Sequence, residues 1–419
     1  MAAPPVTITP TTVTPGDGPN WPRFHGPNGD NISSDTGLLK EWPDGGPPLD
    51  WTCEKIGIGY SSVSMAGGLI YTAGNKDDKA TTISAIDMDG NVKWQVENGA
   101  AYTGSHPGTR GTPTIDGDRL YHQSPVGSII CLNATTGDKI WSINSLETFQ
   151  AQNITWALAE SLLIDGDRVI TCPGGPEASV VALNKMTGEV VWKAESTGQK
   201  TAYATTSLVE FGGLRIIFAM TAKALIGVDA DNGRLLFEHP FKTEHDANSL
   251  MPLFHDGKVF ISGGYGTTGS ELLKVVVQGD KASVEMVWPS RDLDNHHGGV
   301  LLIDGFLYGA AHSFSKGQWI CLDWNTGETK WAAYGVGGRN ERKRKGSSTY
   351  AEGMMYMVSE DRYAGLAKIS PTGLEIVSEF PLPEGSRDSS WAHPVVCGGR
   401  LYIRHDNRLF AYNVKANDE

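Results

Sequence analysis

The sequence contains no apolar run long enough to cross a membrane, and it has little positive charge. Of its 419 residues, 48 are Asp or Glu and 35 are Lys or Arg, so the formal net charge is −13 at pH 7. A membrane-spanning helix needs about 20 apolar residues in succession, and a nucleic-acid-binding face needs an excess of basic side chains. We therefore expect neither a membrane span nor a nucleic-acid partner.

Cysteine is also scarce. The chain has five cysteines, of which no two are adjacent, and it has no Cys-x-x-Cys-His motif. The absence of that motif excludes covalent haem c. Cys131 and Cys321 occupy equivalent positions in a sequence repeat, where we expect buried thiols that pack as small hydrophobes. The spacing of the other three cysteines gives no reason to predict a disulfide.

Glycine, by contrast, is abundant and marks a repeat. Eight short apolar runs each break at a glycine-containing turn and resume with an aromatic or β-branched residue. Such turns need a positive φ and are a strong hairpin signal. Their spacing of roughly 40–50 residues is typical of a four-stranded propeller blade. The residues that resume the runs are Tyr71, Tyr121, Ile170, Ile217, Phe260, Tyr308, Tyr356 and Tyr402.

A second motif follows in most repeats. Three segments read Asx-x-x-Thr-Gly-x-x-x-Trp, namely Asn133–Trp141, Asn184–Trp192 and Asp323–Trp331. The Asx side chain closes a tight turn, glycine takes the left-handed position, and the indole packs between neighbouring blades. Related copies that lack one feature end at Trp94, Phe237 and Trp288.

The last repeat is incomplete, because no Thr-Gly turn or outer tryptophan follows Leu401–Val414. A matching outer strand lies near the other end of the chain, at residues 49–53, where Trp51 takes the motif position. Strands from both termini would close the ring and hide the sheet edges. The sequence predicts one all-β domain over residues 20–414, an eight-bladed β-propeller with four-stranded antiparallel blades. Residues 1–19 are expected to form a disordered leader and 415–419 a tail.

The turn lengths distinguish the two faces of the disc. The tight turns share one face, and the longer connections emerge on the other, which is the better place for a binding site. Residues just before an innermost strand lie nearest the central axis. This rule places a ring of side chains around the channel mouth, with Glu160 slightly deeper: Tyr60, Arg110, Trp156, Tyr203, Asn248, His297, Ser347 and His393.

The residue types in this ring suggest roles. We interpret His297 and His393 as candidate catalytic bases, with Asp246 and Glu160 orienting them or binding a cation. The candidate ligand- or cofactor-binding residues are Arg110, Trp156, Tyr203, Asn248, Lys345 and Trp391. His106, His296 and His297 form a candidate metal site. The basic run Arg339–Lys345 is interpreted as a solvated loop from which Lys345 reaches the centre.

These motifs resemble the repeats of pyrroloquinoline quinone dehydrogenases and their relatives, which include a periplasmic lipoprotein of outer-membrane β-barrel assembly. The segment Trp21–Asp30 is similar to the start of a bacterial secreted branch labelled PQQ-like or polyvinyl-alcohol-dehydrogenase-like. Shorter matching stretches are Arg110–Pro113, Gly263–Gly266, Asn295–Gly299 and Trp391–Pro394. The resemblance implies a periplasmic or secreted protein and raises pyrroloquinoline quinone with calcium as a cofactor. The vicinal cysteine pair of those alcohol oxidisers is missing here, and their catalytic carboxylates have no residue-by-residue match.

Three functions remain open at this point. The first, narrowly preferred, is a quinoprotein-type oxidoreductase of alcohols or sugars with a small-molecule or carbohydrate ligand in the pocket. The second is a non-enzymatic scaffold for protein partners, which predicts an exposed apolar patch and no organised pocket. The third is a His/Tyr- or metal-dependent lyase or hydrolase of a polysaccharide. It requires His106, His245, His297 or His393 to converge with Arg110 and with Tyr60 or Tyr203.

Overall fold

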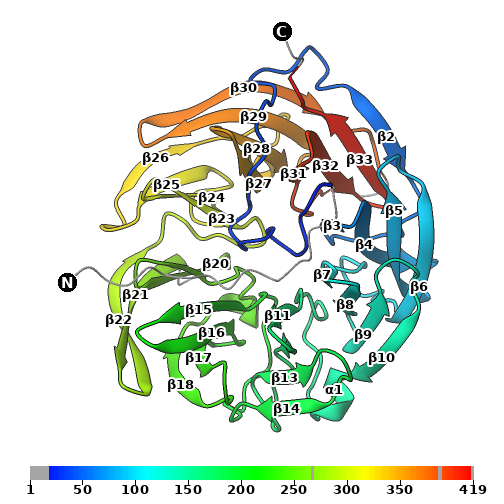
Figure 1. Cartoon of the computed structure of the whole chain (residues 1–419). Helices are drawn as coiled ribbons and strands as arrows, with labels where there is room; N and C mark the ends of the chain where they lie inside the picture. The colour runs from blue at the N-terminus through cyan, green and yellow to red at the C-terminus, as the bar shows by residue number, and fades with distance from the viewer. Residues whose placement is uncertain (1–17, 266–268, 386–388, 417–419) are drawn as a thin grey trace.

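Eight antiparallel sheets follow one another around a central axis in the computed structural model, which describes residues 18–265, 269–385 and 389–416 (Figure 1). Within these residues the eight-bladed propeller expected from the sequence is confirmed. The expected leader lies outside the described residues, apart from Gly18 and Pro19. In the expected tail, Lys415 forms a bridge with Leu38, and residues 417–419 are outside the described part.

Each blade consists of four strands. Blade 1 contains β3 (Ser64–Ala66), β4 (Leu69–Lys76), β5 (Ala80–Asp87) and β6 (Val92–Ala100); blade 2 contains β7 (Thr114–Asp116), β8 (Arg119–Gln123), β9 (Ser128–Asn133) and β10 (Lys139–Asn144). Blade 3 contains β11 (Leu163–Asp165), β12 (Arg168–Thr171), β13 (Val181–Asn184) and β14 (Val190–Lys193); blade 4 contains β15 (Ser207–Phe211), β16 (Leu214–Met220), β17 (Ala224–Asp229) and β18 (Leu235–Pro240). Blade 5 contains β19 (Leu253–His255), β20 (Lys258–Gly263), β21 (Gly269–Gln278) and β22 (Lys281–Ser290); blade 6 contains β23 (Val300–Ile303), β24 (Phe306–Ala310), β25 (Trp319–Asp323) and β26 (Thr329–Ala333). Blade 7 contains β27 (Gly346–Ala351), β28 (Met354–Ser359), β29 (Tyr363–Ser370) and β30 (Gly373–Pro381); blade 8 contains β31 (Val395–Cys397), β32 (Arg400–His405), β33 (Arg408–Asn413) and β2 (Leu49–Cys53).

Blade 8 closes the ring as predicted. Its three inner strands come from the C-terminal end of the chain, and β2 pairs antiparallel with β33, with Trp51 opposite Ala411. Figure 1 shows the blue β2 beside the red β33. This pairing covers the outer edge of β33, which would otherwise be an exposed template for another strand.

The repeated tryptophan connects six of the blades to the next one. The ring of Trp141 packs on Gly188, where an added Cβ would lie 2.7 Å from the indole. Its Nε1 donates to the Lys185 carbonyl at 3.0 Å. The same bond joins Trp51 to Met88, Trp94 to Ala134, Trp192 to Ala230, Trp288 to Trp324, and Trp331 to Ser370. Glycine is needed at these turns both for its positive φ and for the missing side chain.

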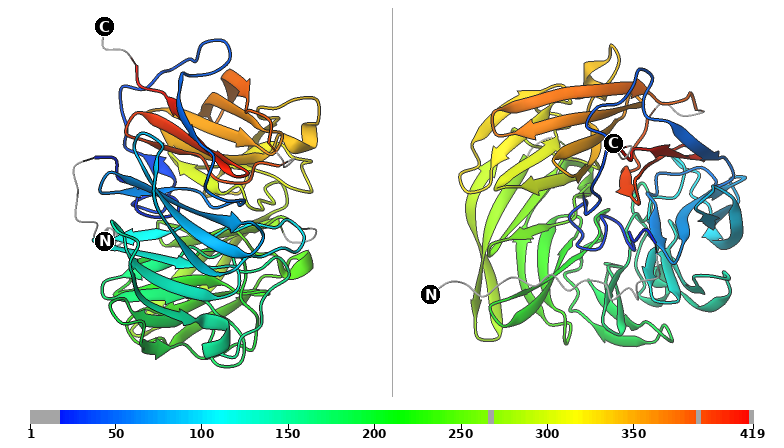
Figure 2. Two further views of the ribbon diagram at one scale, coloured as in Figure 1. Left: turned by 90° about the vertical axis from the view of Figure 1, so that its right-hand side faces the viewer. Right: turned by 45° about the horizontal axis from the view of Figure 1, so that its top comes forward.

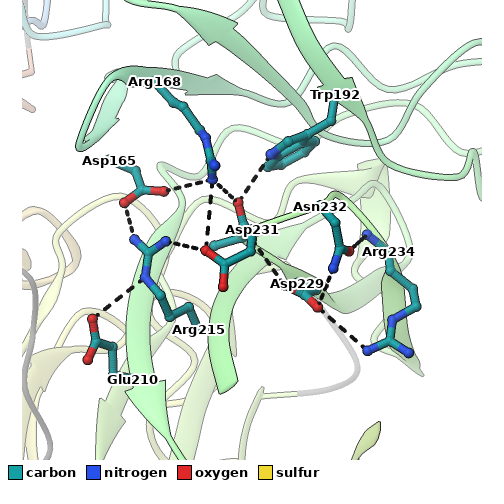
Figure 3. A network of polar contacts seen from close by, with 10 residues as sticks. Asp165, Arg168, Trp192, Glu210, Arg215, Asp229, Asp231, Asn232 and Arg234 are labelled. Carbon is teal, nitrogen blue, oxygen red and sulfur yellow. Dashed lines mark hydrogen bonds and ion pairs between the residues drawn. The ribbon is translucent and has the colours of Figure 1, made fainter. Parts of the chain in front are cut away.

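Ion pairs on the tight-turn face reinforce one of these contacts (Figure 3). Arg215 of β16 bonds Asp165 at the end of β11, and its Nη1 lies 2.6 Å from Asp231. Arg168 donates to the Ala230 carbonyl at 2.6 Å. The guanidinium groups therefore join blades 3 and 4. Asp165 is buried, whereas Asp231 is exposed, so the pair with Asp231 is a surface pair worth about 0–1 kcal/mol.

The connections from the outer strand of one blade to the inner strand of the next are long. They contain the helix α1 (Ser145–Thr148) and the 3₁₀ helices η1 (Glu244–Asp246) and η2 (Glu341–Lys343). The connections from the second to the third strand, also expected to be long, are often short, as at residues 77–79 and 360–362. Both kinds reach the same face because antiparallel strands alternate in direction.

The N-terminal arm, residues 20–33, enters the central channel, which the repeat pattern does not predict. Trp21 pairs with Met65 of blade 1 through two backbone bonds, and β1 (Ile32–Ser33) pairs parallel with β27 of blade 7. Figure 1 shows this dark blue segment near the centre of the ring, and Figure 2 gives two further views of it. The arm leaves a cavity of about 80 Å³ on its other side, toward blades 3 to 6.

The amino-acid composition led us to expect no membrane-spanning segment and to expect that Cys131 and Cys321 are buried. None of the helices in residues 18–265, 269–385 and 389–416 has the length and apolar character to cross a membrane. The five cysteines are free and buried. Cys131 and Cys321 lie in the apolar clusters of their blades, where burial raises the pKa of both thiols.

Candidate functional site

A cavity of about 280 Å³ opens on the long-connection face of the disc. This volume lies just below the ~300 Å³ at which typical ligand pockets begin. Most of its lining residues come from the segments that precede the innermost strands, as the sequence rule predicts. The lining includes nine of the residues selected as candidates from the sequence: His106, Arg110, Trp156, Tyr203, His296, His297, Lys345, Trp391 and His393.

The N-terminal arm forms the floor of this cavity. Phe24 lines the cavity and stacks on His25, with ring centroids 3.9 Å apart. The edge of His393 meets Phe24 at 5.0 Å. The arm therefore blocks the central channel beneath the site, so the cavity is a blind pocket rather than a pore.

Aromatic rings form two groups on the walls. Trp156 stacks with Tyr265 at 6.1 Å and lies against Tyr203 at 5.8 Å. On the other side, Trp391 packs against Tyr60 at 4.7 Å and against His106 at 4.9 Å. Flat apolar faces with polar edges suit a ring-shaped, hydroxyl-rich ligand.

A buried ion-pair cluster lies between blades 6 and 7. Lys345, just before β27, places its Nζ 2.5 Å from Nδ1 of His312 and 3.5 Å from Oε1 of Glu360. The same Glu360 oxygen accepts a bond from Nε1 of Trp391 at 3.0 Å. Burial lowers the pKa of Lys345 and raises the pKa of Glu360, since it penalises the charged form of each.

The cavity histidines are held neutral. Burial, together with nearby His312 and Lys345, lowers the pKa of His296 well below its usual value. His297 is affected in the same way, by burial first and by His296 next. Burial also lowers the pKa of His312 and of His393 to about 4. At neutral pH these imidazoles are therefore uncharged.

His393, a predicted general base, has both ring nitrogens occupied. Its Nε2 lies 2.7 Å from the His297 carbonyl, which can only accept, so this nitrogen carries the proton. Its Nδ1 lies 3.0 Å from Nε2 of His25 and must be the acceptor there. The structure thus gives His393 a role in fixing the N-terminal arm, because no ring nitrogen remains for a ligand.

Arg110 lines the cavity but also supports its own loop. Its guanidinium donates to the carbonyls of Gly108 and His106, at 3.0 and 2.8 Å. It lies over the rings of Tyr60 and Tyr102, at 5.3 and 5.5 Å from their centroids. The positive charge is therefore fixed at the wall in a rigid position.

Three predicted site residues lie elsewhere. Asn248 is buried, and its amide donates to the carbonyls of Thr221, Ala222 and Phe241, so it holds backbone rather than a cofactor. Asp246 is exposed on η1 and does not line the cavity. Glu160 points into blade 3, where its Oε2 accepts from Thr171 and from the Cys172 amide, each at 3.0 Å.

Glu160 makes the stability of the protein dependent on pH. Its Oε1 is buried without a partner among the described residues, and burial raises the pKa of Glu160 from 4.5 to about 7. Glu160 ionises at a lower pH in the unfolded chain, so we expect its contribution to stability to be full below about pH 4.5 and to decrease as the pH rises to about 7. The shift corresponds to about 3 kcal/mol. We expect Glu160→Gln to remove this loss, measured by urea unfolding across that range; parallel curves for the two proteins would contradict it.

Three lining residues, Tyr265, His312 and Glu360, were missed as site candidates by the sequence rule. Each follows a second strand: Tyr265 after β20, His312 after β24 and Glu360 after β28. The rule considered only residues that precede an innermost strand, although the adjacent strand ends on the same face. A search of the short connections after the second strands would have found all three.

The cavity does not fit a metal or a calcium-bound quinone. Within the described residues, no group of three or more His, Cys, Asp or Glu is arranged to hold a metal ion. His296 and His297 instead face each other through their Nδ1 atoms, 2.9 Å apart. Calcium takes six to eight oxygen ligands, whereas the lining supplies one carboxylate, Glu360, which is already bonded to Trp391.

Comparisons with known proteins agree with the fold. Residues 59–333 match the family described as outer membrane protein assembly factor BamB. A quinoprotein ethanol dehydrogenase from Pseudomonas aeruginosa is 27% identical over 138 residues, which are 30% of this chain and 22% of that protein. The chain therefore spans about a fifth of the length of this curated relative.

Two solved structures show the same architecture. BamB from Moraxella catarrhalis has a TM-score of 0.58 at 13% identity and covers 88% of this chain and 99% of its own. Quinohemoprotein alcohol dehydrogenase from Comamonas testosteroni has a TM-score of 0.62 at 13% identity, over 96% of this chain and 81% of its own. At this identity the similarity concerns the fold alone.

Proposed function

Because this chain belongs to the family described as outer membrane protein assembly factor BamB, whose fold serves several functions, we propose a function from its own cavity. The protein binds an acidic sugar in the blind pocket and removes a proton from it, as a polysaccharide lyase does. It acts outside the cytoplasm, where an outer membrane family and a secreted branch belong. The observation that carries the proposal is the convergence of aromatic rings, two cations and neutral histidines in one cavity.

The charge and shape of the lining support an acidic sugar. Arg110 and Lys345 stand against a single carboxylate, Glu360, so the lining is positive although the whole chain carries −13. Trp156 and Trp391 offer ring faces on which a sugar can pack. The volume of about 280 Å³ suits one or two sugar rings rather than a long polymer segment.

The titrating groups favour elimination over hydrolysis. Glycoside hydrolysis commonly uses two carboxyl groups that flank the bond, and the cavity lining contains one. Removal of a proton beside a carboxylate needs a neutral base near a positive charge, which the histidines near Lys345 provide. Of the three functions left open by the sequence, the His/Tyr-dependent lyase requires a histidine to converge with Arg110 and with Tyr60 or Tyr203. His106, His297, Tyr60, Tyr203 and Arg110 all line the cavity.

The other two functions have less support. The quinoprotein oxidoreductase would need calcium ligands that the lining does not supply. The protein-binding scaffold predicts an exposed apolar patch and no organised pocket. Side chains such as Met186, Val190 and Val191 are exposed on the outer rim of blade 3, but the pocket argues for a small ligand.

Binding of glucuronate oligomers against the matching glucose oligomers tests the ligand class by calorimetry. We expect the acidic oligomer to bind and the neutral one to bind at least tenfold more weakly. Lys345→Met should reduce the affinity for the acidic oligomer at least tenfold, which is about 1.4 kcal/mol. Lys368→Met, on the exposed outer part of β29, is the matched control and should have no effect. Equal binding of both oligomers would reject the proposal.

A further inference from the structure

The hydrogen bonds in the cavity determine which imidazole nitrogens carry protons. Nδ1 of His312 accepts from Lys345, since the lysine can only donate, so the proton of His312 is on Nε2. His393 is fully occupied between His25 and the His297 carbonyl. Neither ring therefore presents an unprotonated nitrogen to a ligand.

The pair His296–His297 has a direction set by Glu360. Oε1 of Glu360 accepts from Trp391 and lies 3.3 Å from Nε2 of His297. Nε2 of His297 makes no hydrogen bond among the described residues, but the negative charge of Glu360 at that distance favours a proton on Nε2, which leaves Nδ1 of His297 as an acceptor. Nδ1 of His296, 2.9 Å away, must then donate. The lone pair of His296 is left on Nε2, to which no hydrogen bond is made within the described residues.

We propose that Nε2 of His296 is the general base of the cavity, with His297 and Glu360 as positioning residues that fix its tautomer. This inference rests on the proposed function and moves the catalytic role predicted for His297 to its neighbour. His296 lines the cavity, and its ring lies 4.7 Å from Tyr265 and 5.0 Å from His312.

The step balances without a further reactant. His296 takes the proton from the ring carbon that bears the sugar carboxylate, and the electrons of that C–H bond form a carbon–carbon double bond. The neighbouring C–O bond to the next sugar breaks, and the departing oxygen receives the same proton from His296. The base is restored, and the products are a shortened chain and an unsaturated acidic sugar.

The two positioning residues act on the protonated base. When His296 gains a proton, its Nδ1–H remains bonded to His297, whose Nε2 lies 3.3 Å from Oε1 of Glu360. The carboxyl group thereby stabilises the positive charge through one intervening ring, by the logic of an oriented catalytic histidine. The burial that keeps His296 neutral in the resting state supports this role but does not define it.

Nitrogen NMR of the full chain, labelled on histidine, tests the tautomers without any substrate. We expect an unprotonated-type signal for Nε2 of His296 and for Nδ1 of His297, assigned by His296→Gln and His297→Gln. Glu360→Met should convert the His296 pattern to a mixture of tautomers, and Glu360→Gln, which keeps an acceptor oxygen, should restore most of it. An unprotonated Nδ1 on His296 in the native chain would overturn the inference.

Activity on acidic oligosaccharides, followed by the ultraviolet absorbance of the unsaturated product, tests the role. His296→Gln should lose about 10²–10⁴-fold in kcat, and Glu360→Met at least tenfold, with partial rescue in Glu360→Gln. The matched control is Glu271→Met. Glu271 of β21 also pairs with a histidine, His239 of β18, but neither residue lines the cavity. Turnover that survives in His296→Gln overturns the inference. Absence of turnover in the native chain, with the expected nitrogen signals, instead overturns the proposed function.

Discussion

Arg404→Met is expected to lower the free energy of unfolding by about 3–5 kcal/mol. Arg404 of β32 is 2% exposed and reaches from blade 8 into blade 1. Its Nη1 donates to the carbonyl of Ala73 at 2.5 Å and to Oγ1 of Thr72 at 2.8 Å, and its Nη2 donates to the carbonyl of Gly57 at 2.9 Å. Methionine fills the space but leaves these buried acceptors without donors.

Urea unfolding followed by tryptophan fluorescence measures this loss. The matched control is Arg234→Met, which removes a guanidinium paired with Asp280 on the exposed rim at 2.6 Å. Its side chain is 41% exposed, so we expect a loss of about 1 kcal/mol or less. If the two variants lose equal stability, Arg404 does not hold the closing seam in the way its contacts indicate.

Trp21→Ala is expected to cost about 3–5 kcal/mol, the range for a large buried aromatic. Trp21 is 2% exposed, packs with Met65 and Val395, and contacts Gly26 closely enough that an added Cβ there would lie 3.0 Å from the ring. Its backbone also pairs with Met65 in both directions. Loss of the indole should therefore release the arm from the channel as well as destabilise the fold.

Limited proteolysis distinguishes release of the arm from general unfolding. We expect cleavage within residues 18–33 of Trp21→Ala under conditions in which the native chain resists. Phe314→Ala, which removes an aromatic ring that is 37% exposed, is the control and should leave both stability and the cleavage pattern nearly unchanged. An arm that stays resistant in Trp21→Ala would show that β1 and the His25–His393 contact secure it without the indole.

The fold could be predicted because its signals are local and repeated. Gly188 needs a positive φ and Trp141 needs a glycine to pack on, so both residues recur in the motif at the same spacing. Even β2, the N-terminal strand that completes the C-terminal blade, could be recognised, since Trp51 keeps the motif position. The position of the N-terminal arm could not be predicted in this way, because the contacts of Trp21 and His25 occur once and are not part of the repeat.

The candidate site was predictable in part. The residues before the innermost strands point to the axis, which placed Arg110, Trp156 and His297 at the cavity. Sequence position does not determine the direction of a side chain. Glu160 points into blade 3 and Asn248 bonds to backbone carbonyls, although both lie near the innermost strands. The direction of the His296–His297 hydrogen bond depends on Glu360. Glu360 is distant in sequence, so this direction could not be predicted from the sequence.

The arm beneath the cavity also limits how a polymer can be used. With Phe24 and His25 across the channel, a saccharide cannot pass through the disc, and whatever enters must leave by the same mouth. Such a dead end accommodates a chain terminus or a short fragment, but not the middle of a strand. Under the proposed lyase function, degradation would therefore proceed stepwise from the chain ends and release small fragments.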